Sequence, residues 1–377
     1  MLIESSRAYG RGLLRGIVKY SHLHEQWAFY SEPGGEERSL PRMKNWHVNG
    51  IIARVSDNKK DKEIIAMGLP FIAVAFKNQV PGVPNIIADN VTIGRMAAEH
   101  LVNCGFQQFA FCGFASLDWS VERRESFSKK LAEAGFQPQI WDRPRHKLTR
   151  LWEQEQTIMA DWLKSLPKPI GLMTCNDDRS RHVIEACKIA GLHVPEEVAI
   201  IGVDNDDLIC NLSDPPLSSI ALNSEKAGYE AAELLHKLMA GEKKPKENIN
   251  IIMYPTHVVT RQSTNILAMK DHDVVKALRF IRQHSKEPIQ VRDVVEAVAI
   301  SRTNLYERFR RSIGHSPNKE IRRARVEHIV QMLMNTNLSV SEIAFTLGYS
   351  SASHIARYFR QEKGISLKDY RKLYGKK

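Results

Sequence analysis

Six polar and aromatic residues stand at or near the ends of apolar stretches in this sequence, and together they could bind a small hydroxylated molecule. They are Arg7, Tyr9, Trp119, Arg123, Asn176 and Asp204. The aromatic rings offer flat apolar faces, and the guanidinium, amide and carboxylate groups donate or accept hydrogen bonds. A sugar or another small polyol needs both kinds of contact, so we interpret the six residues as a candidate sugar site without a catalytic residue.

The stretch AIIGVDNDDL permits a different chemistry, because Asp204 and Asp206 follow an apolar run with the spacing D-x-D. This pattern resembles the motif of haloacid-dehalogenase-type phosphatases, in which Asp204 would be the nucleophile and Asp206 the acid, with magnesium between them. That family also needs an acidic pair on a later strand, and none follows here. A sugar phosphatase stays the alternative, to be recognised by magnesium-dependent turnover that Asp204→Asn abolishes.

Neither nucleotide nor metal chemistry is favoured elsewhere in the sequence. The stretch GRGLLRG contains Gly10, Gly12 and Gly16, but Arg15 stands where the third glycine of a dinucleotide-binding fingerprint belongs. The five cysteines are scattered, odd in number and never spaced C-x-x-C, which argues against a zinc site or a disulfide framework. Such cysteines fit reduced thiols in the cytosol. We therefore expect no cofactor and no bound metal.

Short apolar runs alternate with longer amphipathic ones over residues 1 to about 262. The runs that predict strands are LIES, WAFYSE, GIIARV, FIAVAF, FAFCGF, IGLMTCN and AIIGVD. The stretches that predict helices include GRGLLRGIVKYSH, IGRMAAEHLVNCG and RSRHVIEACKIAG. Apolar strands separated by helices indicate parallel sheets covered on both faces, and the length suits two such lobes. Ligands of such sheets bind beyond the carboxyl ends of the strands, where the six candidate residues fall.

The last third of the chain contains one helical pattern twice. In residues 290–314, an apolar stripe with the spacing i, i+3, i+4, i+7 is followed by a turn and then by Leu305 and Phe309. Residues 339–364 repeat this order and end with Ile355 and Phe359. Each copy predicts a helix-turn-helix unit. The stretch that begins at Ser316 and Pro317 predicts a helix between the units, which would hold their second helices about 34 Å apart.

The side of each second helix that faces away from its apolar pair is predicted to contact DNA. The residues expected to reach base edges are Thr303, Asn304, Glu307 and Arg311 in the first unit and Ser353, His354, Arg357 and Gln361 in the second. The residues expected near phosphates, towards the flanks, are Arg302, Arg308, Arg310 and Arg360. In the second unit, Ser339 and Glu342 form the S-x-x-E pattern of a capping box, and Gly348 permits the turn.

The net charge of +11 lies in the smaller part of the chain. Residues 1–266 contain 32 Lys+Arg and 32 Asp+Glu, whereas residues 267–377 contain 22 and 11. A basic part joined to a neutral part indicates a polyanion partner for the basic part. We expect double-stranded DNA, with protein or RNA as the alternative. The sequence has no apolar run of about 18 residues and no signal-peptide pattern, so we expect a cytoplasmic protein without a membrane partner.

Two family resemblances agree with this division. Roughly residues 1–262 resemble the lactose-repressor-type sugar sensors, which have a periplasmic-binding-protein-like fold, on the stretches NVTIGRMAAEHLVNCGFQQFAFCGF, GLMTCNDDRSRHVIEACKIAGLHVPEEVAIIGVDND and PPLSSIALN. The last 110 residues resemble the AraC-type DNA-binding domain on SVSEIAFTLGY, the two matched units and YFRQEKGIS. A sensor of the first kind ahead of a domain of the second, with the YGRGLLRGI opening, is similar to the bacterial xylose operon regulators.

The resemblance implies α/β architecture, with two doubly wound parallel-sheet lobes at residues 1–262, a linker at 263–272 and an all-α domain with two helix-turn-helix units at 273–377. It implies a non-enzymatic transcription regulator that senses D-xylose and controls pentose catabolic genes. We expect an activator, but a repressor and a regulator of another sugar stay open. Arg123, Asn176 and Asp204 match ligand contacts of the repressor family. The implied partners are DNA, the sugar, a second copy of the chain and RNA polymerase.

Three features depart from what the resemblance leads us to expect. Leu367 replaces the usual proline after the final Gly-x-Ser, and Ile355 replaces the usual aromatic residue of the second recognition helix. Both are apolar, so we expect them to be packed. Only Leu2 and Ile3 precede the polar end of the first strand at Glu4, whereas a strand normally has about five to six residues. We expect a form with further apolar residues upstream to have a higher melting temperature.

Overall fold

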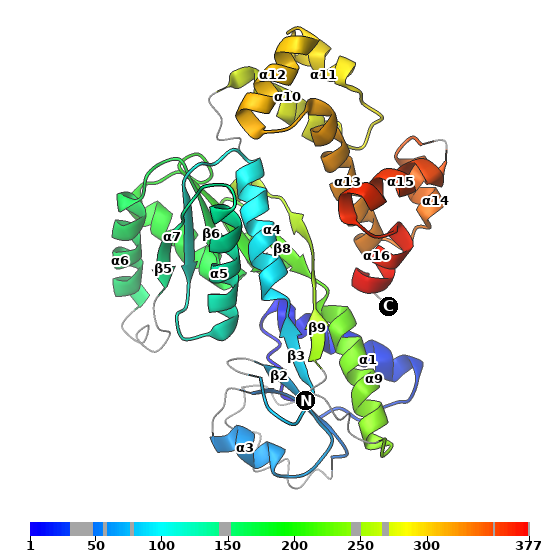
Figure 1. Cartoon of the computed structure of the whole chain (residues 1–377). Coiled ribbons are helices and arrows are strands. Elements are labelled where there is room, and N and C mark those ends of the chain that lie inside the picture. Colours follow the sequence, from blue (N-terminus) through cyan, green and yellow to red (C-terminus); the bar gives the residue numbers. More distant parts are fainter. Residues whose placement is uncertain are drawn as a thin grey trace.

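The computed structural model of the chain describes residues 1–30, 48–55, 59–75, 79–142, 152–242, 250–265, 271–349 and 351–375. These residues form two α/β lobes and a helical domain (Figure 1). In the view of Figure 1, the first lobe lies at the bottom, the second lobe above it, and the helical domain at the upper right. The predicted α/β class and the all-α C-terminal domain are confirmed.

The first lobe contains a four-stranded parallel sheet in the order β1 (Ile51–Val55), β2 (Phe71–Ala75), β3 (Asn85–Ala88) and β9 (Asn250–Met253). Its helices are α1 (Ala8–Leu23), α3 (Lys59–Ile65) and α9 (Ser224–Met239). A Cβ atom on Gly16 would stand 1.9 Å from the carbonyl oxygen of Glu225, and one on Gly228 would stand 2.1 Å from that of Leu13. Gly12 and Gly16 of GRGLLRG therefore serve the close packing of α1 against α9, whereas Gly10 lies against the backbone of Glu4.

The second lobe contains a six-stranded sheet in the order β10, β8, β7, β6, β4, β5, in which only β10 runs antiparallel to its neighbour. Its strands are β4 (Phe109–Gly113), β5 (Gln139–Asp142), β6 (Ile170–Thr174), β7 (Val198–Asp204), β8 (Ser218–Leu222) and β10 (Pro255–Val259). Its helices are α4 (Asn90–Asn103), α5 (Asp118–Ala132), α6 (Trp152–Ser165), α7 (Asp177–Ala190) and α8 (Asp207–Leu212). The central strands are apolar throughout because helices cover both of their faces.

Three chain crossings join the lobes. They are the passages from β3 to α4, from β8 to α9 and from β9 to β10. The backbones of these crossings pair with one another, since the N–H of Asp89 donates to the carbonyl of Met253 (2.9 Å) and that of Asn223 donates to the carbonyl of Tyr254 (3.0 Å). The three parallel crossings form the junction about which the lobes can rotate relative to each other.

The helical domain contains α10 (His272–Gln283), α11 (Val291–Val298), α12 (Arg302–Ile313), α13 (Pro317–Asn335), α14 (Val340–Thr346), α15 (Ala352–Lys363) and α16 (Leu367–Tyr374). Helices α11 and α12 form the first predicted unit, and α14 and α15 form the second. The long helix α13 joins their two cores, because Ile321 and Ala324 pack with the first unit and Ile329 and Met332 with the second. The predicted packing of α13 against both units is confirmed.

Some of the predicted elements are wrong. The run LIES makes only an isolated bridge between Leu2 and Ala53, because the chain turns into α1 at Ala8. The run WAFYSE has no regular structure up to Tyr30, and its rest lies outside the described residues. Trp27 and Phe29 pack on the core of the first lobe through their rings instead of pairing in a sheet. The short strands β3, β5, β8, β9 and β10 were not predicted.

The boundary of the sensing part also lies later than predicted. Ser263 and Thr264, assigned to the linker at 263–272, are fully buried against the second lobe. The hydroxyl of Ser263 donates to the carbonyl of Ile200 at 2.6 Å, and His272 already belongs to α10. Residues 266–270 of that linker lie outside the described residues. Among the helices of the described ranges, none is long and apolar enough to cross a membrane.

Candidate functional site

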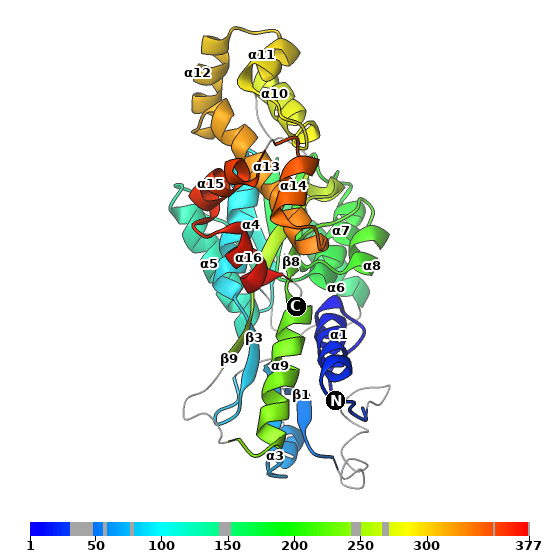
Figure 2. The same cartoon turned by 90° about the vertical axis from the view of Figure 1, so that its right-hand side faces the viewer.

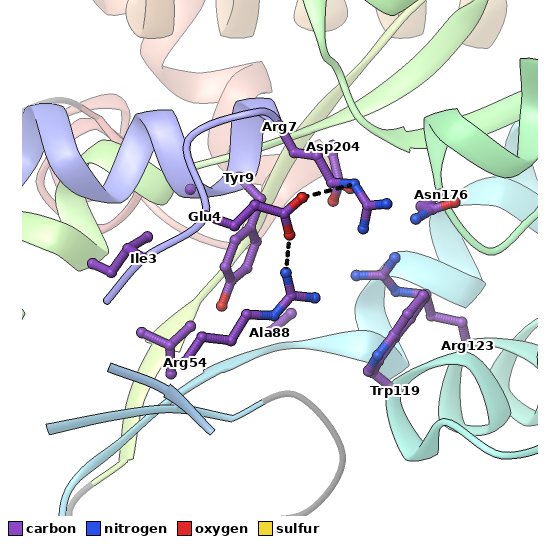
Figure 3. A pocket seen from close by; sticks show the side chains of 12 residues that line it. Ile3, Glu4, Arg7, Tyr9, Arg54, Ala88, Trp119, Arg123, Asn176 and Asp204 are labelled. Carbon is purple, nitrogen blue, oxygen red and sulfur yellow. Dashed lines mark hydrogen bonds and ion pairs between the residues drawn. The ribbon is translucent and has the colours of Figure 1, made fainter. Parts of the chain in front are cut away.

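A cavity between the two lobes brings the six candidate residues together (Figure 3). Arg7 and Tyr9 come from the start of α1, Trp119 and Arg123 from α5, Asn176 from the end of β6 and Asp204 from the end of β7. The carboxyl ends of β6 and β7 lie side by side in the parallel sheet, which places Asn176 and Asp204 at one edge. The cavity is lined by Ile3, Glu4, Arg7, Tyr9, Gly10, Arg54, Val74, Ala88, Trp119, Arg123, Asn176 and Asp204.

Glu4 and Arg54 are charged residues of this cavity that the sequence analysis did not include. Arg54 lies inside the run GIIARV and is paired with the carboxylate of Glu4. The same carboxylate lies 3.7 Å from Nε of Arg7 (Figure 3). A single arginine within an apolar strand is unusual, because a buried charge needs a partner. The presence of one arginine in this otherwise apolar run could have identified Arg54 as a candidate site residue.

The guanidinium of Arg123 is held in place from several sides. It is 4% exposed, its Nε donates to Oδ1 of Asn90 at 2.9 Å, and its Nη1 donates to the carbonyl of Cys175. Its Cζ lies 5.0 Å from the ring centroid of Trp119. Asn90 is fixed in turn by donating to Glu122 at 2.7 Å. Burial lowers the pKa of Arg123, and Asp204 opposes this shift. Arg123 thus lies against the ring of Trp119, and both side chains line the cavity.

Asp204 lines the cavity in a strained backbone conformation. Its φ is 104° and that of Asn205 is 48°, values that residues other than glycine adopt rarely. Hydrogen bonds hold the turn, since Asn205 N–H donates to the Ser219 hydroxyl (3.0 Å) and Asp206 N–H donates to Asp177 (2.8 Å). Such strain is retained where the surrounding structure fixes it, and it aims the carboxylate of Asp204 at the cavity.

Several charges act on Asp204. Burial raises the pKa of its carboxyl to about 6, and the carboxylates of Asp178 and Asp206 act in the same direction. Arg123 and Arg7 oppose the rise. A carboxyl with this pKa is mostly ionised at pH 7, so it can accept hydrogen bonds from hydroxyl groups of a ligand.

Asn176 and Tyr9 complete the polar lining. The amide oxygen of Asn176 accepts from Arg179 N–H at 2.9 Å and caps α7, so its amide nitrogen is the group that can donate to a ligand. Burial raises the pKa of Tyr9 well above its usual value, which keeps its hydroxyl protonated. The cavity therefore offers donors, acceptors and an aromatic face at fixed positions.

Two sets of contacts beside the cavity join the lobes. Arg7 Nε of the first lobe lies 2.6 Å from Oδ2 of Asp178 in the second. Asp206 of the second lobe accepts from Arg11 Nη2 at 2.8 Å and from the N–H of Ala8 at 2.7 Å. Asp206 thus lies at the N-terminal end of α1, where unpaired N–H groups and the helix dipole favour a carboxylate. These contacts hold the lobes close together over the cavity.

The second helix-turn-helix unit has the predicted local geometry. Ser339 and Glu342 form a capping box at the start of α14, and Gly348 has a φ of 74° in the turn. Ile355 and Phe359 are fully buried, and Leu367 is only 2% exposed. The residues predicted to contact DNA from α15 are all exposed: Ser353, His354, Arg357, Arg360 and Gln361. The structure thus leaves this side of α15 accessible to a partner.

The first unit differs at two predicted contacts, Asn304 and Arg308. Arg302, Thr303, Glu307, Arg310 and Arg311 are exposed on α12. Arg308, however, is bound within the domain, because its Nη1 lies 2.9 Å from Asp271 and 3.1 Å from Asp273, and its Nε donates to Asn304 at 2.9 Å. Arg308 and Asn304 therefore tie α12 to the start of α10. A phosphate or a base would have to compete with these contacts.

Comparisons with known proteins divide the chain in the same way. Residues 98–264 match the family described as periplasmic binding protein-like domain, and residues 294–373 match the helix-turn-helix domain family. The xylose operon regulatory protein of Escherichia coli K12 is 30% identical over 98% of this chain and 96% of its own length. That of Haemophilus influenzae Rd is also 30% identical, over 98% and 97%.

Solved structures agree with this assignment. The structure of a xylose-binding transcription activator covers 99% of this chain and 97% of its own, with 30% identity and a TM-score of 0.61. A cellobiose complex of a transcriptional regulator shares the sensor fold at 20% identity, with a TM-score of 0.54 over 68% of this chain.

The phosphatase alternative is not favoured. The relatives that match the chain over its length are transcription regulators. In addition, Asp206, the acid of that hypothesis, is 2% exposed and bound to Arg11, Ala8 and Leu208. From the identity over the whole chain, the two-lobed sensor and the paired helix-turn-helix units, we conclude that this protein belongs to the xylose operon regulatory protein family of DNA-binding transcription regulators.

Proposed function

We propose that this regulator senses D-xylose in the cavity between its lobes and controls pentose catabolic genes in response. The observation that carries the proposal is the convergence of Arg7, Tyr9, Trp119, Arg123, Asn176 and Asp204 on one interlobe cavity. The relatives named for xylose, which span nearly the whole chain, support this choice of sugar.

The charges of the cavity favour a neutral ligand over a sugar acid or a sugar phosphate. Arg7 faces Asp178, Arg54 faces Glu4, and Arg123 is electrostatically coupled to Asp204. Three cations are thus balanced by three carboxylates. An added anion would find these arginines already paired and would lie close to Glu4 and Asp204, the two of these carboxylates that line the cavity, and like charges at short range repel. A neutral pentose can instead use the same groups through hydroxyl hydrogen bonds.

In the proposed mechanism, the sugar bridges the lobes and favours the closed arrangement. Asp204 accepts from sugar hydroxyls, Arg123 and Asn176 donate to sugar oxygens, and the indole of Trp119, which lines the cavity, packs against the sugar ring. The sugar can shift the lobe equilibrium by no more than the difference between its affinities for the closed and the open arrangement. That shift changes the placement of the helix-turn-helix units and hence the affinity for DNA.

For the DNA side, we propose that α12 and α15 enter successive major grooves. The exposed residues of both helices support this orientation. The buried side is fixed by Leu305 and Phe309 in α12 and by Ile355 and Phe359 in α15. We further propose that the protein acts in the cytoplasm as a homodimer and activates transcription through contact with RNA polymerase. The activator name of the related structure supports the last point.

A thermal-shift panel with the full chain tests the sugar assignment. D-xylose, L-arabinose, D-ribose, D-glucose and D-xylose 5-phosphate are added at increasing concentration. A ligand at a hundred times its Kd stabilises the native state by about 2.7 kcal/mol, which raises the melting temperature measurably. We expect the largest shift with D-xylose and none with the phosphate. A panel in which no pentose shifts the melting temperature contradicts the proposal.

A further inference from the structure

The last helix of the DNA-binding domain lies across the junction of the two sensor lobes. Figures 1 and 2 show α16 and the C-terminus directly above the first turn of α9, next to the crossings between the lobes. Residues of α16 contact Lys226 in α9 of the first lobe and Thr256 in β10 of the second lobe. One short helix of the DNA-binding domain is therefore seated on both lobes at once.

The contact with the second lobe is made by Tyr370. Its hydroxyl donates to the carbonyl oxygen of Thr256 at 2.9 Å, and the side chain is 6% exposed. Burial raises the pKa of Tyr370 well above its usual value, so the hydroxyl keeps the proton that it donates. Tyr374, one turn later, packs edge-on against Tyr254, with 5.7 Å between the ring centroids. Tyr254 belongs to the crossing from β9 to β10.

The contact with the first lobe is made by Lys226. Its ammonium group donates to the carbonyl oxygen of Lys372 at 2.5 Å and to that of Leu373, although the side chain is only 7% exposed. These carbonyls belong to the C-terminal end of α16, where backbone acceptors lack helical partners and the helix dipole favours a cation. The buried lysine of the sensor thus binds the end of a helix of the DNA-binding domain.

Helix α16 is in turn firmly attached to the second helix-turn-helix unit. Leu367 and Tyr370 share one core with Ile355 and Phe359 of α15, and the rings of Phe359 and Tyr370 stand 5.4 Å apart. Arg371 Nε also donates to the carbonyl of Leu333 in α13 at 3.3 Å. A change in the seat of α16 therefore moves α15.

We propose that the surface formed by Lys226, Tyr254 and Thr256 is the site at which the sensor transmits its lobe arrangement to the DNA-binding domain, with α16 as its occupant. Lys226 and Thr256 belong to different lobes, so we expect a rotation about the crossings to change the direction from one to the other and to weaken one of the two contacts to α16. Here the lobes are held together by the Arg7–Asp178 pair, and α16 is seated. The closed arrangement therefore favours the docked helix.

The inference rests on the proposed sugar response, and the two make separate predictions. If D-xylose favours closed lobes, it strengthens the docking of α16 and changes the affinity for DNA by a coupling factor. Linkage requires that DNA change the affinity for D-xylose by the same factor. Disrupting the seat of α16 should reduce this factor in both directions and leave the sugar cavity itself intact.

The experiment compares Tyr370→Phe and Lys226→Met with the wild-type full chain. Tyr370→Phe removes the hydroxyl donated to Thr256 and keeps the ring in its core. Lys226→Met removes the ammonium group and keeps the aliphatic chain. Lys372→Met is the control, because it also removes one positive charge, but from an exposed side chain. Lys372 contacts Lys226 through its backbone carbonyl oxygen, which this substitution keeps. Calorimetry gives the Kd of D-xylose without DNA, and titration of a duplex selected by the wild-type protein from a random library gives the Kd of DNA with and without D-xylose.

We expect Lys372→Met to bind D-xylose within about twofold of wild type. Tyr370→Phe and Lys226→Met should still bind D-xylose, but a few-fold more weakly, since a helix that is no longer docked also stops favouring the closed arrangement. Coupling factors of this kind are typically about 5- to 150-fold, and we expect Tyr370→Phe and Lys226→Met to lower the factor by about threefold or more. Lys372→Met should keep it. Hydrogen exchange of residues 367–374 should slow when D-xylose binds the wild-type protein. Unchanged coupling in both variants, or unchanged exchange in α16, overturns the docking proposal, whereas a wild-type protein that does not bind D-xylose overturns the proposed sugar response.

Discussion

The carboxylate of Asp206 in the second lobe accepts two hydrogen bonds from Arg11 in the first lobe, each 2.8 Å long. The side chain of Asp206 is 3% exposed and that of Arg11 is 26% exposed, so water screens this ion pair only in part. The pair lies beside the contact of Asp206 with the N–H of Ala8. It joins the two lobes, and neither residue lines the cavity.

Removing this ion pair should weaken sugar binding indirectly. In Arg11→Gln, we expect the open arrangement to gain population. The apparent affinity for D-xylose then falls in proportion to the fraction of molecules that remain closed. We expect a loss of about 5- to 30-fold in affinity, since one partly buried ion pair contributes about 1–2 kcal/mol. Calorimetry gives the Kd, and small-angle scattering without sugar should show a larger radius of gyration. Arg15→Gln, on the exposed side of α1, should leave both values unchanged; equal effects of the two substitutions would contradict this role.

Asp204 should be a direct contact of the sugar. Replacing it with asparagine keeps the shape but removes the charge, and a hydrogen bond to a charged group contributes about 1.5–3 kcal/mol. Asp204→Asn should therefore weaken D-xylose binding by about 10- to 100-fold and suppress the thermal shift at moderate sugar concentration. Binding of the selected duplex without sugar should not change, because Asp204 lies in the sensor. Wild-type affinity for D-xylose in this variant would remove Asp204 from the site.

The pKa of Asp204 also predicts a pH dependence. Because burial raises this pKa to about 6 from the usual 3.8, the folded protein holds the proton more tightly than the unfolded chain. The contribution of Asp204 to stability therefore decreases as the pH rises from about 4 to about 6. Sugar binding behaves in the opposite way if the ionised carboxylate accepts from hydroxyls: affinity for D-xylose should fall as the pH drops below about 6, by up to tenfold per pH unit.

Calorimetry in buffers of different ionisation enthalpy checks this dependence, since binding near pH 6 should release a proton. Asp204→Asn serves as the control and should bind D-xylose with nearly constant affinity between pH 5 and 7. A wild-type affinity that stays constant over this range, or proton uptake on binding, shows that the carboxyl is not the acceptor.

The sequence pattern predicted the parts of this fold in which local chemistry decides the structure. Apolar runs indicated the buried parallel strands, and the polar residues that follow them converge on the cavity. The repeated stripe with its capping box indicated both helix-turn-helix units. The strands β3 and β9, with four residues each, were too short to produce a recognisable pattern.

Other features depend on contacts between distant segments, which local patterns do not encode. Arg54 enters the cavity because the N-terminal segment brings Glu4 beside it, 50 residues away in sequence. Lys226 and Lys372, 146 residues apart, meet because α16 folds back onto the sensor. Arg308 was predicted from its position on the helix, but the nearby carboxylates of Asp271 and Asp273 bind it.

Arg357 and Arg360 should differ in how they contribute to DNA binding. Both side chains are exposed on α15, and the fully buried Ile355 and Phe359 fix the side that faces the core. We expect Arg357 to reach O6 and N7 of a guanine from the outward face, and Arg360, towards the flank, to contact a phosphate. Arg357→Ala should therefore cost about 1–3 kcal/mol on the selected duplex and relax the preference at one or two base pairs. Arg360→Ala should weaken binding to selected and scrambled duplexes alike and lower the slope of log K against log salt by about one.

Titrations of both variants on both duplexes at several salt concentrations separate these outcomes. An equal loss on both duplexes for Arg357→Ala would show that this orientation of α15 is wrong.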